Sequence, residues 1–378
     1  MKVVVAMDSF KGSMTSMEAG RAVREGILRA LPDTEVIVRP LADGGEGTTE
    51  ALAEGLGGEL VQTEVRGPLG TPVKASYGVI RGTRTAIMEM AAAAGILLVG
   101  KERRPLDATT YGVGELIKDA VAGGCRNFII GIGGSATNDG GIGMLTALGY
   151  EFLNARGEAA GIGAGALKEV VSVRTDRVLP ELKECSFRIA CDVTNPLCGP
   201  NGATYIYGPQ KGVTEEMRAE LDAAMAGYAK VCSGCTGTDY MESAGAGAAG
   251  GLGFAFLTFL NGELQPGIEL VLDAVEMEQT IEGADMVFTG EGRLDAQTAM
   301  GKAPAGIAKL ARKHGAKVVA LAGAVADGAE TCNEHGIDAF FPILRGVATL
   351  EEAMEPETAR QNIRKTAEQI MRLAAALK

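Results

Sequence analysis

The opening of this 378-residue chain repeats one pattern, in which a buried strand ends in a loop that carries Asp and Gly and a helix follows. Residues 2–7 form a continuous apolar run, which is typical of a strand buried on both faces. The loop 8–13 follows, and Ser16 is predicted to cap a helix that ends before Pro32. A strand over 35–39, a loop and a second helix repeat the pattern. This alternation favours an α/β fold.

The pattern changes after residue 60. Short strands are predicted over 60–65, 73–80 and 85–90, and turn signals separate them where helices stood before. Three strands without intervening helices indicate a meander, so we place a domain boundary at this change. Alternating strands and helices return from residue 285 onward.

The predicted fold class is therefore α/β with two domains. The first is a discontinuous doubly wound domain formed by residues 1–65 and 285–378, and the second is an α/β domain inserted over 66–284. Within the insertion, a strand over 127–130 leads into a Gly-rich loop at 131–141, and a helix is predicted over 215–231.

Composition and charge exclude several classes of function. A net charge of −12 disfavours binding along a nucleic-acid backbone, and 4 % aromatic residues with no Trp disfavour stacking platforms for bases or sugars. Only two His are present, so acid–base chemistry falls to carboxylates or Lys. Neither a heptad pattern nor a long exposed apolar edge stands out, so an oligomer is neither predicted nor excluded.

The cysteines and the apolar segments predict a cytoplasmic protein. Seven scattered Cys, an odd number, indicate a reducing compartment. The pair Cys232 and Cys235 fits a redox motif or half a zinc site only in contexts that this chain lacks, so we expect small residues in a loop. The apolar run after Lys2 is too short for a secretory signal. The uncharged stretch 243–262 is interpreted as a Gly-rich turn and a buried helix, not a membrane span.

Chemistry-bearing residues gather where the predicted strands end. In open α/β sheets, ligands bind outside the carboxyl ends of the strands. There, glycine exposes backbone N–H groups to anions, Lys11, Arg293 and Lys302 could neutralise phosphate or carboxylate charge, and carboxylates could hold Mg²⁺ or accept a hydroxyl proton. Together these groups are what phosphoryl transfer requires. The loops in question are 8–13, 43–48, 131–141, 192–196 and 290–295.

Two alternatives use the same loops. Gly131, Gly133 and Ala136 match a loosened dinucleotide fingerprint with Glu151 following, which would suit an NAD-dependent oxidoreductase. The helix breakers at 138–141 count against it. The second alternative is a non-catalytic module that binds a small anion, although it has no need of the several carboxylates. Any single strand-end Asp is also typical of a turn or helix cap.

Six segments, in the same order over nearly the whole chain, resemble the bacterial glycerate kinase family, type I. They are 8–13 (DSFKGS), 42–48 (ADGGEGT), 132–141 (IGGSATNDGG), 192–197 (DVTNPL), 207–212 (YGPQKG) and 290–295 (GEGRLD) followed by 301–304 (GKAP). One departure is Tyr207, where the family pattern has Phe, and we expect it to leave activity unchanged.

The resemblance implies an ATP- and Mg²⁺-dependent kinase that converts D-glycerate to 2-phosphoglycerate, with 3-phosphoglycerate as the alternative product. It also implies a flavodoxin-like discontinuous domain, an inserted domain similar to a restriction-endonuclease fold, and an active site in the cleft between them.

On the matched motifs we assign four sets of roles as hypotheses. The catalytic candidates are Asp192, Asp295, Asp43 and Lys11. The glycerate-binding candidates are Arg293, Ser9, Asn195 and Gln297. The ATP-binding candidates are Gly133, Gly134, Ser135, Thr137 and Lys302. The Mg²⁺ candidates are Glu291 and Asp295. Arg293 is paired with the glycerate carboxylate because a guanidinium fork fits a carboxylate.

Overall fold

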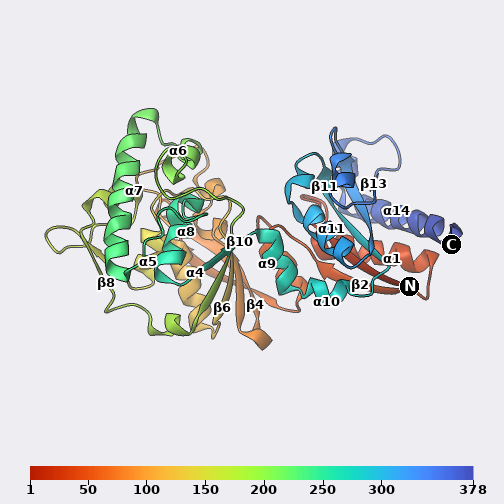
Figure 1. The fold of residues 1–378 in the computed structure, drawn as a ribbon, viewed down its shortest axis with the longest axis horizontal. Helices are drawn as coiled ribbons and strands as arrows, with labels where there is room; N and C mark the ends of the chain where they lie inside the picture. The colour runs from red at the N-terminus through yellow and green to blue at the C-terminus, as the bar shows by residue number, and fades with distance from the viewer. Residues whose placement is uncertain (378) are drawn as a thin grey trace. The chain divides into compact units, whose positions relative to one another are not determined.

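The computed structural model describes residues 1–377 and all their side chains except that of Met300 (Figure 1). Contacts within the chain divide it into two compact units. Unit 1 comprises Met1–Asp43, Glu54–Gly57 and Ile268–Lys378, and unit 2 comprises Gly44–Ala53 and Gly58–Gly267. Both units combine helices and strands, so the chain is a mixed α/β protein, as predicted.

Unit 1 is built on a five-stranded, wholly parallel sheet in the order β13-β12-β11-β1-β2. Its strands are β1 (Lys2–Met7), β2 (Glu35–Pro40), β11 (Met286–Leu294), β12 (Lys317–Val325) and β13 (Ala339–Pro342). Its helices are α1 (Ser16–Ala30), α9 (Gly267–Ala274), α10 (Met277–Ile281), α11 (Ala303–Lys313), α12 (Thr331–Glu334), α13 (Leu350–Met354) and α14 (Pro356–Ala376), with the 3₁₀ turn η6 (Thr298–Met300). Helix α2 (Thr48–Gly55) has residues in both units, and Gly267, the first residue of α9, is counted in unit 2.

Both faces of the sheet in unit 1 are covered. Val3, Val5 and Met7 of β1 join a core with α1 and α14, and Val4, which points to the opposite face because strand side chains alternate, is equally buried. Helices α1 and α14 lie side by side (Figure 1). Gly26 of α1 permits this close approach, since a Cβ there would stand 2.1 Å from the carbonyl oxygen of Arg364.

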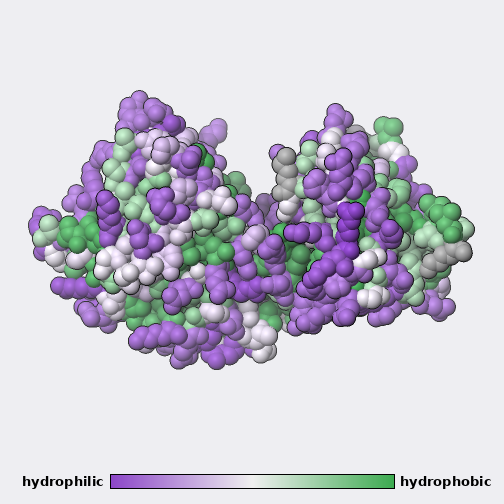
Figure 2. Space-filling model, in the orientation of Figure 1, coloured by the Kyte–Doolittle hydropathy of each residue, from purple (hydrophilic) through white to green (hydrophobic). Residues whose placement is uncertain are grey.

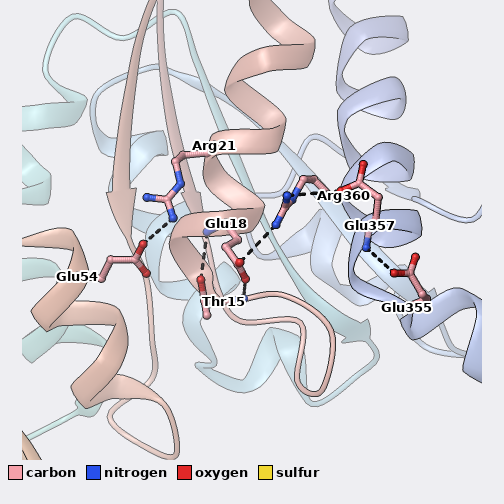
Figure 3. A network of polar contacts seen from close by, with 7 residues as sticks. All are labelled: Thr15, Glu18, Arg21, Glu54, Glu355, Glu357 and Arg360. Atoms are coloured by element: carbon pink, nitrogen blue, oxygen red, sulfur yellow. Dashed lines mark hydrogen bonds and ion pairs between the residues drawn. The ribbon is translucent and has the colours of Figure 1, made fainter. Parts of the chain in front are cut away.

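The helix cap predicted at Ser16 was wrong by one residue. Thr15 caps α1 through a capping box, in which its hydroxyl accepts from the Glu18 N–H and the Glu18 carboxylate accepts from the Thr15 N–H at 2.9 Å (Figure 3). Arg360 of α14 donates to the same carboxylate at 3.4 Å. Ser16 is buried, and its hydroxyl donates to the carbonyl of Met7 at the end of β1. This tertiary hydrogen bond occupies the hydroxyl that was predicted to cap the helix.

Unit 2 contains a six-stranded mixed sheet in the order β10-β9-β6-β5-β4-β3 and a two-stranded sheet of β7 and β8. Its strands are β3 (Glu59–Arg66), β4 (Pro72–Ile80), β5 (Thr85–Glu89), β6 (Asn127–Gly131), β7 (Glu151–Leu153), β8 (Ser172–Arg174), β9 (Ser186–Ala190) and β10 (Glu263–Gln265). Its helices are α3 (Ala91–Ala94), α4 (Tyr111–Ala122), α5 (Ile142–Ala147), α6 (Ala203–Tyr207), α7 (Glu215–Thr236) and α8 (Ala248–Phe259). The 3₁₀ turns used below are η2 (Ile96–Val99) and η5 (Pro209–Lys211).

The meander predicted between residues 60 and 90 is confirmed, since β3, β4 and β5 pair antiparallel in sequence order. Strands β5, β6, β9 and β10 pair in parallel, so their carboxyl ends share one edge of the sheet. Among the buried apolar residues under this sheet, Phe128 and Phe187 stack with ring centroids 4.8 Å apart.

Two segments depart from the predicted elements. Strand β11 continues to Leu294, so most of the 290–295 motif is extended strand, hydrogen-bonded to β12 rather than a loop. Helix α7 continues to Thr236, so Cys232 and Cys235 lie in its final turns, and all seven cysteines are free. The stretch 243–262 agrees with its prediction, because α8 has left-handed, non-helical backbone at 249–251 and its buried apolar helix follows.

The visible surfaces of both units are largely polar, with smaller apolar patches (Figure 2). Among residues 1–377, no helix combines the length and apolar character that crossing a membrane requires.

Candidate functional site

The carboxyl edge of the sheet in unit 1 has a reversal point between β1 and β11. The chain leaves β1 toward β2 on one side, and β11 with its successors lies on the other, which is where open α/β sheets bind ligands. Asp8 follows β1 directly, and its N–H donates to the carbonyl of Gly290 in β11 at 2.8 Å. The 8–13 and 290–295 motifs therefore begin side by side.

Carboxylates from three strand ends interact at this edge. The pKa of Asp8 is raised to about 7, mainly by burial and also by the negative charges of Asp43 and Glu291, while the Ser9 N–H and Lys11 oppose the rise. The Ser9 N–H donates to the Asp8 carboxylate at 2.6 Å. Sequence reasoning placed Asp8 in a candidate loop but gave it no role. Its position in the sequence could have indicated a role, because Asp8 is the first residue after a strand that is buried on both faces.

Glu291 lies in the same cluster and links it to the end of β11. Burial raises its pKa, and Asp295 and Asp43 add to the effect, while Thr298 and Lys302 lower it. The Thr298 hydroxyl donates to the Glu291 carboxylate at 2.6 Å. The cluster thus concentrates negative charge at a partly buried strand end, which a bound cation or a proton would relieve.

Three predicted residues line one open pocket of about 610 Å³ in unit 1. They are Arg293, Asp295 and Gln297, and Ala296, Ala326 and Asp327 complete the lining. Asp295 also orders the turn, since one of its oxygens accepts from the Gln297 N–H at 2.9 Å. The nitrogens of Arg293 and Lys302 approach its two oxygens at 3.8 and 3.9 Å. Arg293 is 69 % exposed, so its guanidinium can reach a small anion.

The Gly-rich loop after β6 dominates the carboxyl edge of unit 2. Gly133 and Gly134 are exposed, and a Cβ at Gly133 would meet no atom within 4 Å, so a ligand can approach the backbone there. Gly134 has a φ of +71°, a conformation that favours glycine. Ser135 is buried at 8 % exposure and forms a bridge with Gly95.

Thr137 does not share the exposure of the two glycines. Its side chain is fully buried, and the Thr137 hydroxyl finds no hydrogen-bond partner among the described residues. Its carbonyl accepts a hydrogen bond from the Lys211 ammonium at 2.6 Å. Lys211 belongs to the 207–212 motif, but sequence reasoning assigned it no role, since burial of a lysine leaves no local signature.

Lys211 is held inside unit 2 at 2 % exposure. Burial lowers its pKa to about 7, although the nearby carboxylate of Asp139 opposes this shift. Asp139 is itself fully buried and accepts from the N–H and hydroxyl of Thr110 at 2.8 and 2.9 Å. Burial raises the pKa of Asp139. Lys211 and Asp139 thus both hydrogen-bond to backbone groups of the Gly-rich loop, at Thr137 and Gly141 respectively.

Asp192 and Asn195 follow β9 at the same edge of unit 2. Asp192 is exposed, and its carboxylate accepts from the Gly267 N–H at 2.9 Å. The Asn195 amide donates to the Asn201 carbonyl at 2.8 Å and accepts from the Tyr207 hydroxyl at 2.6 Å. Phe, the residue of the family pattern at position 207, could not form this hydrogen bond. The difference at Tyr207 therefore adds a contact to Asn195, a residue predicted to bind the substrate.

The predicted site residues thus form two groups. Unit 1 holds Ser9, Lys11, Asp43, Glu291, Arg293, Asp295, Gln297 and Lys302, and unit 2 holds Gly133, Gly134, Ser135, Thr137, Asp192 and Asn195. Among residues 1–377, no set of three or more His, Cys, Asp or Glu side chains is spaced to hold a metal ion alone.

The geometry of unit 2 does not support the dinucleotide alternative. Gly131, the first glycine of the fingerprint, is explained by packing within the chain, since a Cβ there would stand 2.4 Å from the carbonyl oxygen of Gly44. The next helix, α5, starts only at Ile142, well beyond the fingerprint, so no helix N-terminus faces it.

Comparison with known proteins supports the resemblance to the glycerate kinase family over nearly the whole chain. Residues 3–375 match the model of the glycerate kinase family. A glycerate kinase of Haemophilus influenzae is 44 % identical over 376 residues, covering 99 % of each chain. A glycerate 2-kinase of Escherichia coli is 46 % identical over 354 residues, covering 93 % of each. A crystal structure assigned as glycerate kinase 2 of Salmonella typhimurium LT2 matches with a TM-score of 0.92 and 42 % identity, covering 100 % of this chain and 98 % of that one. The chain therefore belongs to the glycerate kinase family.

Proposed function

We propose that this protein transfers the γ-phosphoryl group of ATP to the 2-hydroxyl of D-glycerate. Phosphorylation of glycerate, with ATP as the donor, follows from membership of the family. The choice of the 2-hydroxyl is carried by one observation, the 46 % identity to a glycerate 2-kinase across nearly the full length. The primary hydroxyl, which would give 3-phosphoglycerate, is the alternative acceptor.

The substrate is proposed to bind through Arg293, whose exposed guanidinium borders an open pocket with Asp295 and Gln297. A guanidinium fork can pair with both oxygens of a carboxylate. Ser9 and Asn195 are proposed to contact the hydroxyl groups of glycerate. This assignment orients the substrate by its one permanent charge.

The phosphates of ATP are proposed to lie on the exposed backbone of Gly133 and Gly134, with Lys302 contributing charge. Ser135 and Thr137 are buried, so their proposed contribution is to the shape of this loop. In the reaction, the glycerate oxygen attacks the γ-phosphorus, the bond to the β-phosphate oxygen breaks, and ADP leaves. Lys11 would neutralise charge on the transferring group.

A carboxylate is proposed to accept the hydroxyl proton. Asp192 and Asp295 are the first candidates, and Asp43 is the third. Asp192 has the exposure that access to a substrate requires. Asp295 lines the pocket that holds Arg293. Each also accepts a backbone N–H, from Gly267 at Asp192 and from Gln297 at Asp295.

Mg²⁺ is proposed to bind at Glu291 and Asp295. Their oxygens suit this ion, which commonly takes one or two carboxylates and fills its other positions with water and substrate phosphates. The raised pKa of Glu291 fits such a site, because burial and neighbouring carboxylates disfavour its charge while no cation is bound. The ion would supply neutralisation of phosphate charge.

For the fold, we propose that the discontinuous unit is a flavodoxin-like domain that carries the other α/β domain as an insertion. Its predicted extent was 1–65 and 285–378, whereas the internal contacts put β3 in unit 2 and α10 in unit 1. The parallel sheet with both faces covered supports the first part. We also propose a cytoplasmic location, which the free cysteines support.

Incubation with D-glycerate, ATP and Mg²⁺, read by ³¹P NMR, tests the function. A 2-phosphoglycerate resonance is expected. A 3-phosphoglycerate resonance would keep the kinase and correct the acceptor, and unchanged glycerate with no ADP would refute the substrate. The Asp192→Asn and Asp295→Asn variants follow in the same assay. Near wild-type turnover in both would refute the assignment of the base to either residue.

A further inference from the structure

Two leucines are exposed beside the Gly-rich loop of unit 2. They are Leu97 and Leu98 of η2, with side chains 84 % and 43 % exposed. Large apolar side chains left open to water next to a ligand loop call for an explanation, because packing them against an apolar group is favourable.

The backbone ties η2 directly to that loop. Ile96, the first residue of η2, donates its N–H to the carbonyl of Gly134 at 2.8 Å, and the Ala136 N–H donates to the carbonyl of Ala94 at 2.9 Å. Leu97 stands two residues after Gly95, which pairs with Ser135, so it lies within about 7 Å of that pairing along the chain. The leucines are therefore neighbours of the exposed glycines.

Positive charge follows immediately in the sequence. The segment 101–104 holds Lys101, Glu102, Arg103 and Arg104, all exposed, so it carries a net positive charge in a chain whose net charge is −12. Arg104 pairs with Glu102 at 3.7 Å and with Asp107 at 2.8 Å, which leaves Lys101 and Arg103 as the cations of interest. The Arg103 guanidinium donates to the carbonyl of Ile96 at 3.1 Å, which fixes the start of η2. An apolar surface, open glycine backbone and cations thus lie together, and this combination matches a nucleotide, which joins a flat base to a polyphosphate.

We propose that Leu97 and Leu98 form the surface on which the base of ATP packs, while Gly133 and Gly134 receive its phosphates. This rests on the proposed function, since it names the nucleotide contacts of the same site. The leucines offer no hydrogen-bonding groups, so they contribute affinity through apolar contact with the ring face.

The test compares ATP with a ligand that lacks the base. We expect Leu97→Ser, and more strongly the double variant with Leu98→Ser, to raise the KM for ATP about tenfold, the equivalent of about 1.4 kcal/mol. Inhibition by inorganic tripolyphosphate should stay unchanged, because phosphate contacts are kept. Both side chains are exposed, so folding should be unaffected. Leu60→Ser is the matched control, since Leu60 is 52 % exposed on the edge strand β3.

Two results would overturn the proposal. One is an unchanged KM for ATP in the double variant. The other is an equal loss of affinity for ATP and tripolyphosphate, which would mean that the leucines shape the phosphate loop. Failure of the wild-type protein to phosphorylate glycerate would refute the proposed function instead. Calorimetric titration with ATP would then still decide the role of the leucines, by the same comparison with tripolyphosphate.

Discussion

Replacement of Lys211 by Met should change how the stability of unit 2 depends on pH. The Lys211 ammonium is buried, and burial lowers its pKa to about 7 from the ordinary lysine value of 10.5. Below pH 7 the amine is charged in both the folded and unfolded states, so the full cost of burying the charge is present. Above about pH 10.5 it is neutral in both, and the cost is gone. The free energy of unfolding of the wild type therefore rises across this window relative to Lys211→Met.

The size of the effect follows from the two pKa values. With a folded pKa of about 7 and an unfolded value near 10.5, raising the pH from about 7 to about 9 should stabilise the wild type by about 2 kcal/mol relative to the variant. The difference in stability between wild type and variant at a single pH is less informative. The variant also leaves the carbonyl of Thr137 without its 2.6 Å hydrogen bond, which costs about 1–3 kcal/mol at every pH. The pH dependence is the decisive observable.

Urea titrations followed by tyrosine fluorescence measure this directly. The chain has no Trp, and all seven Tyr lie between residues 77 and 240, so the signal reports on unit 2 alone. The control is Lys183→Met, which removes an exposed amine from the same unit. If wild type and Lys211→Met kept a constant difference, within about 0.5 kcal/mol between pH 7 and 9, the buried-charge argument would be refuted.

Two further predictions concern unit 1. In the wild type, kcat/KM should rise about tenfold between pH 6 and 8, because burial and the charges of Asp43 and Glu291 place the pKa of Asp8 at about 7. Asp8→Asn should abolish this ionisation in the pH profile. A rise of the same size in the variant would contradict the prediction. Arg293→Lys should raise the KM for glycerate about tenfold or more and the KM for ATP less than about twofold, since lysine cannot pair bidentately with a carboxylate. Steady-state kinetics measure both KM values, with a substitution at an exposed arginine, Arg312→Lys, as the control. An equal rise in the two KM values would count against the role of Arg293.

Much of the fold was readable because it depends on local patterns. The buried runs at 2–7 and 127–130 became β1 and β6, and the meander before residue 90 was found from turn signals between short strands. The candidate loops followed from one rule, that parallel strands present their carboxyl ends at a common edge. The roles assigned within those loops stay predictions.

Other features depended on contacts that no local pattern contains. Ser16 satisfies the preferences of a helix cap, yet the carbonyl of Met7 binds its hydroxyl and Thr15 takes the cap. Strand β11 runs through the 290–295 motif because β12 supplies hydrogen bonds along it, which outweighs the turn preference of two glycines.

By itself, the sequence determined where strands and helices alternate and which polar loops end the strands, since the spacing of apolar residues and the positions of Gly and Pro act over a few residues. Only the tertiary structure decided which of these polar groups are buried. Asp8 meets carboxylates from distant strands, Lys211 reaches the carbonyl of Thr137 across 74 positions, and Tyr207 bonds Asn195. Burial and charge depend on segments far apart in the chain, so the pKa of a side chain is a property of the folded protein.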